Sequence, residues 1–193
     1  MKRIRITLFL CASLAIVSCK NDKKENDAEK ASESEMSQET NKEEVKKVTL
    51  TIDPKSGSNL TGNAVFTQEN GEVTMTAVID GLAEGMHAIH IHENADCSAE
   101  DGSSAGGHWN PTFEKHGKWG DPAGYHKGDI GNFKVDANGN GTITMTTNEW
   151  CIGCDDETKN IIGKSVVIHD GVDDFTSQPS GNAGTRVGCG TIK

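Results

Sequence analysis

The sequence has few aromatic residues, few prolines and no apolar run long enough to cross a membrane. Aromatic residues make up 5% of its 193 positions, and 4 Pro stand against 22 Gly. The only continuous apolar stretch, residues 4–17, is shorter than the roughly 20 residues that a transmembrane helix needs. A polytopic membrane protein is therefore excluded. A hydrophobic fraction of 34% and a mean hydropathy of −0.54 indicate one soluble domain of ordinary size.

Positive charge is also scarce. The 19 Lys and Arg residues face 29 Asp and Glu residues, which gives a formal net charge of −10. Removal of residues 1–18, which contain three basic groups, would lower the net charge to −13. A protein of this charge repels polyanions, so nucleic acid is excluded as a partner.

The N-terminus has the composition of an export signal. Lys2, Arg3 and Arg5 flank the start of the apolar stretch, and Ser18 precedes Cys19. The letters IVSC resemble a bacterial lipobox, in which the cysteine becomes the lipidated first residue. We expect a lipoprotein signal peptide over residues 1–18 and a membrane anchor at Cys19, on the periplasmic face or the outer surface of the cell envelope. An ordinary signal peptide cleaved at another position is the alternative.

Residues 19–47 have the composition of a disordered, charged linker. Residues 20–47 contain seven Lys, nine Asp or Glu and almost no apolar side chain. Such a segment cannot bury enough apolar surface to offset the entropy lost on ordering. A short solvated helix is the alternative, although no apolar face recurs at helical spacing.

The remaining residues, 48–193, form the predicted folded domain. Short alternating runs rich in Val, Ile and Thr are separated by turn signals at residues 69–71 and 137–141. This pattern predicts an all-β fold, a Greek-key β-sandwich or flattened barrel of about eight antiparallel strands. Residues 94–129 and 171–185 interrupt the pattern and are rich in Gly, so we expect two long functional loops. The predicted strands include residues 48–52, 63–68, 72–79, 87–92, 133–135, 141–147 and 165–170.

Every histidine of the chain lies on the strand that enters the first long loop, inside that loop, or next to the second loop. His90 and His92 are two residues apart, so a strand presents both imidazoles on one face. Imidazole with a carboxylate and no nearby thiolate favours zinc or copper over calcium or magnesium. Six histidines and Asp129 exceed the needs of one tetrahedral ion, which indicates two sites with a shared ligand. The histidines are His87, His90, His92, His108, His116, His126 and His169.

Five motifs together resemble the copper,zinc superoxide dismutases. They are GMHAIHIHENADC from Gly85, GGHWNPTFEKHG from Gly106, YHKGDIGN from Tyr125, IIGKSVVIHD from Ile161 and GNAGTRVGCG from Gly181. The resemblance covers essentially all of residues 48–193. It implies one copper and one zinc per subunit, and the conversion of two superoxide anions and two protons to O2 and hydrogen peroxide by ping-pong Cu(II)/Cu(I) cycling.

The resemblance also assigns roles to individual residues. His87 matches a histidine that binds backbone and no metal, and Asp173 matches a carboxylate that orients ligands of both metals. Arg186 matches the arginine that guides superoxide to copper, and His108 would carry a proton during the reaction. The implied copper ligands are His90, His92, His108 and His169, and the implied zinc ligands are His108, His116, His126 and Asp129.

The predicted second loop contains no Lys or Arg, although lysines there steer the substrate in well-known members of the family. Some bacterial members carry their guiding cations on the other loop. Lys115, Lys118 and Lys127 are the candidates for that role here.

Four cysteines remain when Cys11 and Cys19 are set aside, and the sequence alone allows three pairings. The resemblance implies a disulfide between Cys97 and Cys189. Cys151 and Cys154 have no counterpart in the common family pattern, and they could form a short local disulfide, a redox pair or a soft metal site. Residues 118–124 form an insertion, whose Trp119 packs over the predicted zinc loop, lies in an interface or, as the favoured alternative, is a buried anchor for the long loop.

Two other interpretations compete with an enzyme. A lipoprotein of the same fold could bind copper and zinc without turnover, and a purely structural lipoprotein would leave the clustered histidines unexplained. The family contains both dimers and monomers, and a homodimer is our hypothesis for this chain.

Overall fold

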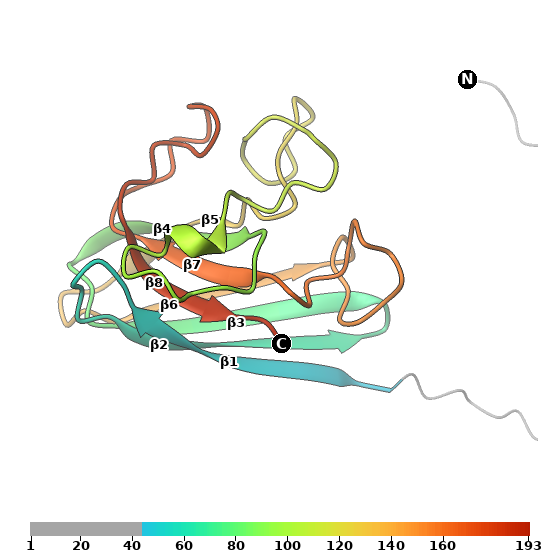
Figure 1. Ribbon diagram of the computed structural model, residues 1–193, viewed down its shortest axis with the longest axis horizontal. Coiled ribbons are helices and arrows are strands. Elements are labelled where there is room, and N and C mark those ends of the chain that lie inside the picture. Colours follow the sequence, from blue (N-terminus) through green and yellow to red (C-terminus); the bar gives the residue numbers. More distant parts are fainter. Residues whose placement is uncertain (1–43) are drawn as a thin grey trace, which may run out of the picture. The chain divides into compact units, whose positions relative to one another are not determined.

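The computed structural model describes residues 44–193 (Figure 1). The predicted signal peptide, the predicted anchor Cys19 and most of the predicted linker lie outside the described residues. The first strand begins at Lys46 and not at Val48. Lys46 and Lys47 pair with Gln68 and Thr67 through their backbones, and this pairing needs no apolar side chain.

Eight antiparallel strands close into one barrel in the order β1-β2-β3-β6-β5-β4-β7-β8. The pairings of β3 with β6 and of β4 with β7 join strands that are not consecutive in the chain, as in a Greek key. The all-β prediction and the predicted strand number are confirmed. The strands are β1 (Lys46–Pro54), β2 (Thr61–Glu69), β3 (Glu72–Asp80), β4 (Gly85–His92), β5 (Gly131–Val135), β6 (Gly141–Thr147), β7 (Ser165–His169) and β8 (Arg186–Thr191).

Two seams divide the barrel into two four-stranded halves. Strands β5 and β6 pair at Val135 and Gly141, and β1 meets β8 only where Asp53 and Pro54 pair with Cys189 and Gly188. Longer ladders join β1, β2, β3 and β6 on one side and β5, β4, β7 and β8 on the other.

Alternation of apolar residues fills the barrel. Along β3, Val73, Met75, Ala77 and Ile79 are fully buried, and the residues between them face outward. Their neighbours in the core come from every other strand and from the loops at the ends of the barrel.

Strands β4 and β7 are buried on both faces. Ile89 and Ile91 of β4 point into the core, whereas His90 and His92 point outward and are still buried. Long loops cover this outer face of the barrel, so polar side chains there are removed from water. A buried polar layer outside an apolar core is the setting that a ligand site needs.

Three long loops connect the strands, one more than the sequence pattern predicted. Residues 93–130 join β4 to β5 and contain the 3-10 helix η1 (Ser103–Ala105), and residues 170–185 join β7 to β8. Both loops rise on the same side of the barrel (Figure 1). The sequence pattern does not predict the third loop, residues 148–164, whose Trp150, Ile152 and Ile161 are buried in the core.

Two disulfides hold loops in place. Cys97 in the 93–130 loop is bonded to Cys189 on β8, with 5.7 Å between the Cα atoms. Cys189 lies with Ala105 and Val167 in a small apolar cluster outside the barrel core. The second disulfide joins Cys151 to Cys154.

Within residues 44–193, no helix combines the length and the apolar character that crossing a membrane requires.

Candidate metal centre

The strands and the loop that follows β4 bring four histidines together: His90, His92, His108 and His169. His90 and His92 lie on the outer face of β4, and His169 ends β7, which pairs with β4. The 93–130 loop returns alongside β4, where His108 forms an isolated β-bridge with His92 and Trp109 N–H donates to the Ile91 carbonyl at 2.8 Å. His92 and His108 are therefore in direct contact although they are far apart in the sequence.

These four imidazoles form the first cluster. One nitrogen of each ring is buried without a hydrogen-bond partner, and these four atoms lie within 4.8 Å of one another. The other nitrogen of each ring makes a hydrogen bond. His92 Nδ1 donates to the Gly106 carbonyl at 2.9 Å, and His169 Nδ1 donates to the Gly184 carbonyl at 3.3 Å. The converging atoms are His90 Nδ1, His92 Nε2, His108 Nε2 and His169 Nε2.

The second cluster is built around the carboxylate of Asp129, which is fully buried. His108 Nδ1 lies 2.8 Å from Oδ1, His116 Nδ1 lies 3.0 Å from Oδ2, and His126 Nδ1 lies 3.2 Å from Oδ1. The backbone N–H groups of Gly117 and His126 donate to Oδ2 at 3.1 and 2.8 Å. His116 and His126 belong to the 93–130 loop, and these bonds fold the loop around the carboxylate.

His108 belongs to both clusters, because Nε2 faces the first and Nδ1 faces the second. Each cluster then offers four ligand atoms, and the two clusters share one ring. Unpartnered buried nitrogens with one carboxylate and no thiolate are a donor set suited to copper and zinc. The residues present therefore fit both metals.

Asp173 connects the two clusters through a hydrogen bond to one histidine of each. Its Oδ2 accepts from His90 Nε2 and its Oδ1 accepts from His116 Nε2, both at 2.9 Å. The Phe175 backbone N–H donates to Oδ1 at 2.7 Å and fixes the carboxylate. Gly181 packs against this group at a φ of 66°, and a Cβ there would collide with Asp173 Oδ1 and His116 Nε2.

Burial lowers the pKa of three imidazoles of the first cluster, His92, His108 and His169, and keeps them neutral. It lowers the pKa of His108 to about 4 against the opposing hydrogen bond with Asp129. Burial and the neighbouring His90 lower the pKa of His169 to about 3, and burial also holds the pKa of His92 well below its usual value. Neutral imidazoles have a free lone pair, so these residues are ready to ligate at neutral pH.

The second cluster carries charge. Burial alone would lower the pKa of His116, but hydrogen bonds with Asp129 and Asp173 outweigh it and raise that pKa to about 9. Burial would raise the pKa of both aspartates, and hydrogen bonds from the histidines hold it below its usual range instead. Both carboxylates are therefore ionised at neutral pH.

His87 lies outside both groups of ligand atoms, as the sequence predicted. Its Nε2 lies 2.9 Å from the Ala83 carbonyl and its Nδ1 lies 3.2 Å from the carbonyl of His169. The ring joins the start of β4 to the end of β7.

A pocket of about 350 Å³ opens onto the first cluster. His92, His108 and His169 line it together with Arg186, whose Nη1 donates to the Gly102 carbonyl at 2.8 Å. Among residues 44–193, no lysine lines this pocket. Lys127, a predicted guiding cation, pairs with Glu149 and does not line this pocket.

Several residues that hold the ligands escaped the sequence analysis. Gln178 accepts from the His116 N–H and donates to the His116 carbonyl, both at 2.9 Å. Glu149 and Trp150 contact the residues on either side of His126. These residues lie far from the ligands in sequence and belong to no motif.

A family model described as copper/zinc superoxide dismutase matches residues 60–192 of the chain. The chain belongs to the copper/zinc superoxide dismutase family. The extracellular Cu-Zn superoxide dismutase of Caenorhabditis elegans is 37% identical to this superoxide dismutase over 141 residues, which cover 70% of this chain and 62% of that protein. The Cu-Zn superoxide dismutases of Haemophilus parainfluenzae and of a serogroup A strain of Neisseria meningitidis are 34% and 33% identical over 153 residues. Each of these two matches covers 74% of this chain and 78% of the relative.

The fold is similar to a known structure as well. A crystal structure of the clock protein EA4 matches with a TM-score of 0.66 and 33% identity, over 76% of this chain and 92% of that chain.

The family and the geometry agree on the two metals. The first cluster is the copper site and the second is the zinc site, one of each per subunit, and the enzyme class is superoxide dismutase. The two disulfides are typical of proteins located outside the cytoplasm.

Proposed function

We propose that this superoxide dismutase works at the bacterial cell envelope and removes superoxide formed outside the cytoplasm. A lipid on Cys19 would tether the folded domain to a membrane through the charged linker that precedes β1. The observation that carries the enzymatic part is the pocket, because Arg186 and three copper ligands line the same space.

The reaction joins two superoxide anions and two protons and yields O2 and hydrogen peroxide. Bound copper supplies the one-electron redox couple that no side chain of this chain offers. The protein supplies the rest. His92, His108 and His169 line the pocket. Asp129 fixes the orientation of His108, and the carbonyls of Gly106 and Gly184 fix His92 and His169.

Arg186 is the guiding cation of the proposal. Burial lowers the pKa of its guanidinium, but arginine stays protonated in proteins, so the charge persists. Its hydrogen bond to Gly102 aims the side chain across the pocket mouth. A fixed cation beside a concave site attracts superoxide and raises the rate of encounter.

His108 is the proposed proton carrier. His108 lines the pocket, and within the described residues its Nε2 has no hydrogen-bond partner. Its Nδ1 forms a hydrogen bond with Asp129, which holds the ring in place. When Nε2 is not bound to copper, it is positioned to hold a proton and to pass it to the reduced substrate in the pocket.

A protein that stores copper and zinc without turnover is the second candidate. Such a protein would need the ligands but not a cation at the pocket mouth, so the position of Arg186 favours the enzyme.

Metal analysis with an activity assay tests the proposal. The full chain would be loaded with both metals, the metals counted, and superoxide consumption measured before and after copper removal. We expect one copper and one zinc per chain and copper-dependent turnover. The variant His169→Ala should lose copper and activity and keep zinc. Wild-type protein that holds copper and shows no turnover would support the storage candidate.

Cell fractionation tests the tether. Full-length protein should sediment with membranes, and Cys19→Ser should move to the soluble fraction with unchanged metal content. Protease treatment of intact cells would then separate an outer-surface from a periplasmic location. Light scattering of the released domain tests the homodimer, which we retain as part of the proposal.

A further inference from the structure

The 148–164 loop contacts both residues that flank the zinc ligand His126. The hydroxyl of Tyr125 donates to Glu149 Oε1 at 2.5 Å, and Lys127 forms an ion pair with Glu149 Oε2. The indole N–H of Trp150 donates to the Lys127 carbonyl at 2.8 Å. Glu149 therefore holds the side chains of both neighbours of His126, and Trp150 holds the backbone of Lys127.

His126 needs such support more than the other zinc ligands do. His116 is held at its second ring nitrogen by Asp173, and His108 is held between the two sites. Within the part of the chain that the structure describes, Nε2 of His126 makes no hydrogen bond, and its ring lines the pocket. The position of this ring depends on the backbone on either side of it.

Trp150 is held rigidly because it is also a core residue. Its side chain is only 1% exposed, and its ring lies 6.1 Å from Phe66 inside the barrel and 5.5 Å from Trp119 in a T-shaped contact. The ring of Trp119 also packs against Tyr125 in a tilted arrangement, with 5.0 Å between the centroids, and lies against the core. Tyr125 and Lys127 are thus connected to the barrel core through one aromatic side chain.

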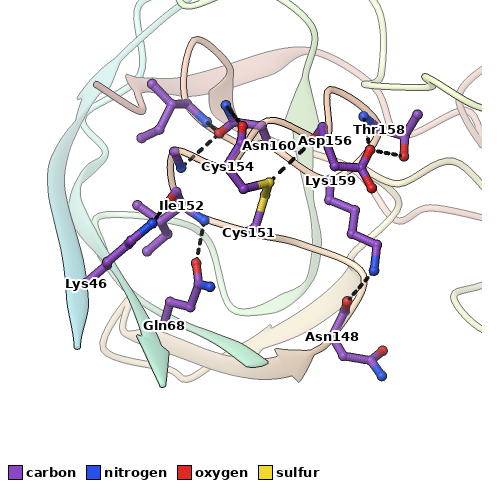
Figure 2. Close-up of a disulfide and its surroundings, with 12 residues drawn as sticks. Lys46, Gln68, Asn148, Cys151, Ile152, Cys154, Asp156, Thr158, Lys159 and Asn160 are labelled. Atoms are coloured by element: carbon purple, nitrogen blue, oxygen red, sulfur yellow. Dashed lines mark hydrogen bonds between the residues drawn. A yellow bond between two sulfur atoms is a disulfide. The ribbon is translucent and has the colours of Figure 1, made fainter. Parts of the chain in front are cut away.

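The loop that carries Glu149 and Trp150 is itself fastened to the barrel (Figure 2). The disulfide between Cys151 and Cys154 closes the turn directly after Trp150. Ile152 N–H donates to Gln68 Oε1 at 2.6 Å, and its carbonyl accepts from Lys46 Nζ at 3.0 Å, which attaches the turn to β2 and β1. The disulfide fixes the backbone from which Trp150 reaches the zinc loop.

We propose that Glu149 and Trp150 are positioning residues for the zinc ligand His126, and that the Cys151–Cys154 disulfide keeps them in register. The copper ligands His90, His92 and His169 lie on β4 and β7 and make no contact with this turn. Loss of the contacts that Glu149 and Trp150 make with Tyr125 and Lys127 should therefore weaken zinc binding and leave copper binding intact. Because the readout is zinc retention, this inference stands apart from turnover and from the proposed membrane tether.

Zinc affinity of the full-length, metal-free protein tests the proposal by competition with a chromophoric chelator. Trp150→Phe deletes the N–H donor and keeps the ring, and we expect zinc affinity about 3- to 10-fold weaker, the effect of one lost buried hydrogen bond. The double variant Cys151→Ser, Cys154→Ser should lower zinc affinity by about the same factor. Copper affinity should change less than twofold in both.

A graded pair at Glu149 keeps the test informative if Trp150→Phe folds poorly. Glu149→Gln retains an acceptor for the Tyr125 hydroxyl and loses the ion pair, whereas Glu149→Ala loses both, so zinc affinity should fall further in Glu149→Ala. Val73→Ala, a core variant on β3, is the control that lowers the melting temperature and leaves zinc affinity unchanged. Hydrogen exchange of residues 124–130 in the metal-free protein should quicken only in the Glu149, Trp150 and cysteine variants.

Unchanged zinc affinity in these variants would overturn the proposal. Equal losses of zinc and copper would also overturn it, because they would show a general loss of stability.

Discussion

Asn132 and Asp173 exchange two hydrogen bonds across the barrel surface. Asn132 Oδ1 accepts from the Asp173 backbone N–H at 2.8 Å, and its Nδ2 donates to the Asp173 carbonyl at 2.9 Å. A side chain on β5 thereby fixes the backbone of the residue whose carboxylate orients His90 and His116. One strand residue outside both ligand sets controls a carboxylate that serves both metals.

Asn132→Ala should weaken both metals, because Asp173 would lose its anchor and its two imidazole partners would lose their common acceptor. Residues that support metal ligands typically change affinity by roughly 10- to 100-fold. Competition titrations with copper and zinc would measure the effect. Unchanged affinity for both metals would show that Asp173 keeps its position without Asn132.

Arg186→Ala should lower the second-order rate with superoxide by about 10-fold and leave both metals bound, since steering by a local cation changes on-rates by about one to three orders of magnitude. The rate of the variant should also depend less on ionic strength. Arg186→Lys is the matched control, because it keeps the charge and loses the geometry of the bond to Gly102. Pulse-radiolysis rates at several salt concentrations provide the measurement, and a full rate for the alanine variant at low salt would refute the role.

Zinc binding to the metal-free protein should release about one proton per chain at pH 8, and copper binding should release almost none. The pKa of His116 is raised to about 9, so this ring is protonated until the pH passes that value and must lose its proton to bind zinc. His108 and His169 have lowered pKa values of about 4 and 3 and are already neutral. Apparent zinc affinity should therefore rise by about tenfold per pH unit up to pH 9 and level off above it.

Calorimetry in buffers with different ionisation enthalpies would count the protons. The reverse order, with copper releasing the proton, would contradict the assignment of the charged ring.

Replacement of Cys97 and Cys189 by Ser should lower the free energy of unfolding by roughly 4 kcal/mol in the chain-entropy model, because the disulfide closes a loop between residues 92 positions apart. The same change frees the η1 region, whose Gly102 carbonyl holds Arg186. Denaturant titration measures the stability, and a lower encounter rate at full metal content would show the effect on Arg186.

Local patterns predicted most of the barrel and the histidine cluster, and the family resemblance assigned the ligands to the two metals. Period-two alternation in β3 and β4 reflects the same pleat that places Val73 in the core and His90 outside it. The contacts of Asn132, Gln178, Glu149 and Trp150 could not be predicted, because each joins residues distant in sequence whose types are common on any surface. The pairing of Lys127 with Glu149 has the same origin.

The two seams of the barrel separate the strands that contribute metal ligands from a half that contributes none. Every strand that contributes a ligand, β4 and β7, belongs to the half with β5 and β8, and the β1-β2-β3-β6 half contributes none. Paired threonines cover part of the outer face of that second half, Thr74 against Thr146 and Thr76 against Thr144. This face is the natural place to graft a label, an affinity tag or a new binding surface, since substitutions there leave the metal ligands and the pocket untouched.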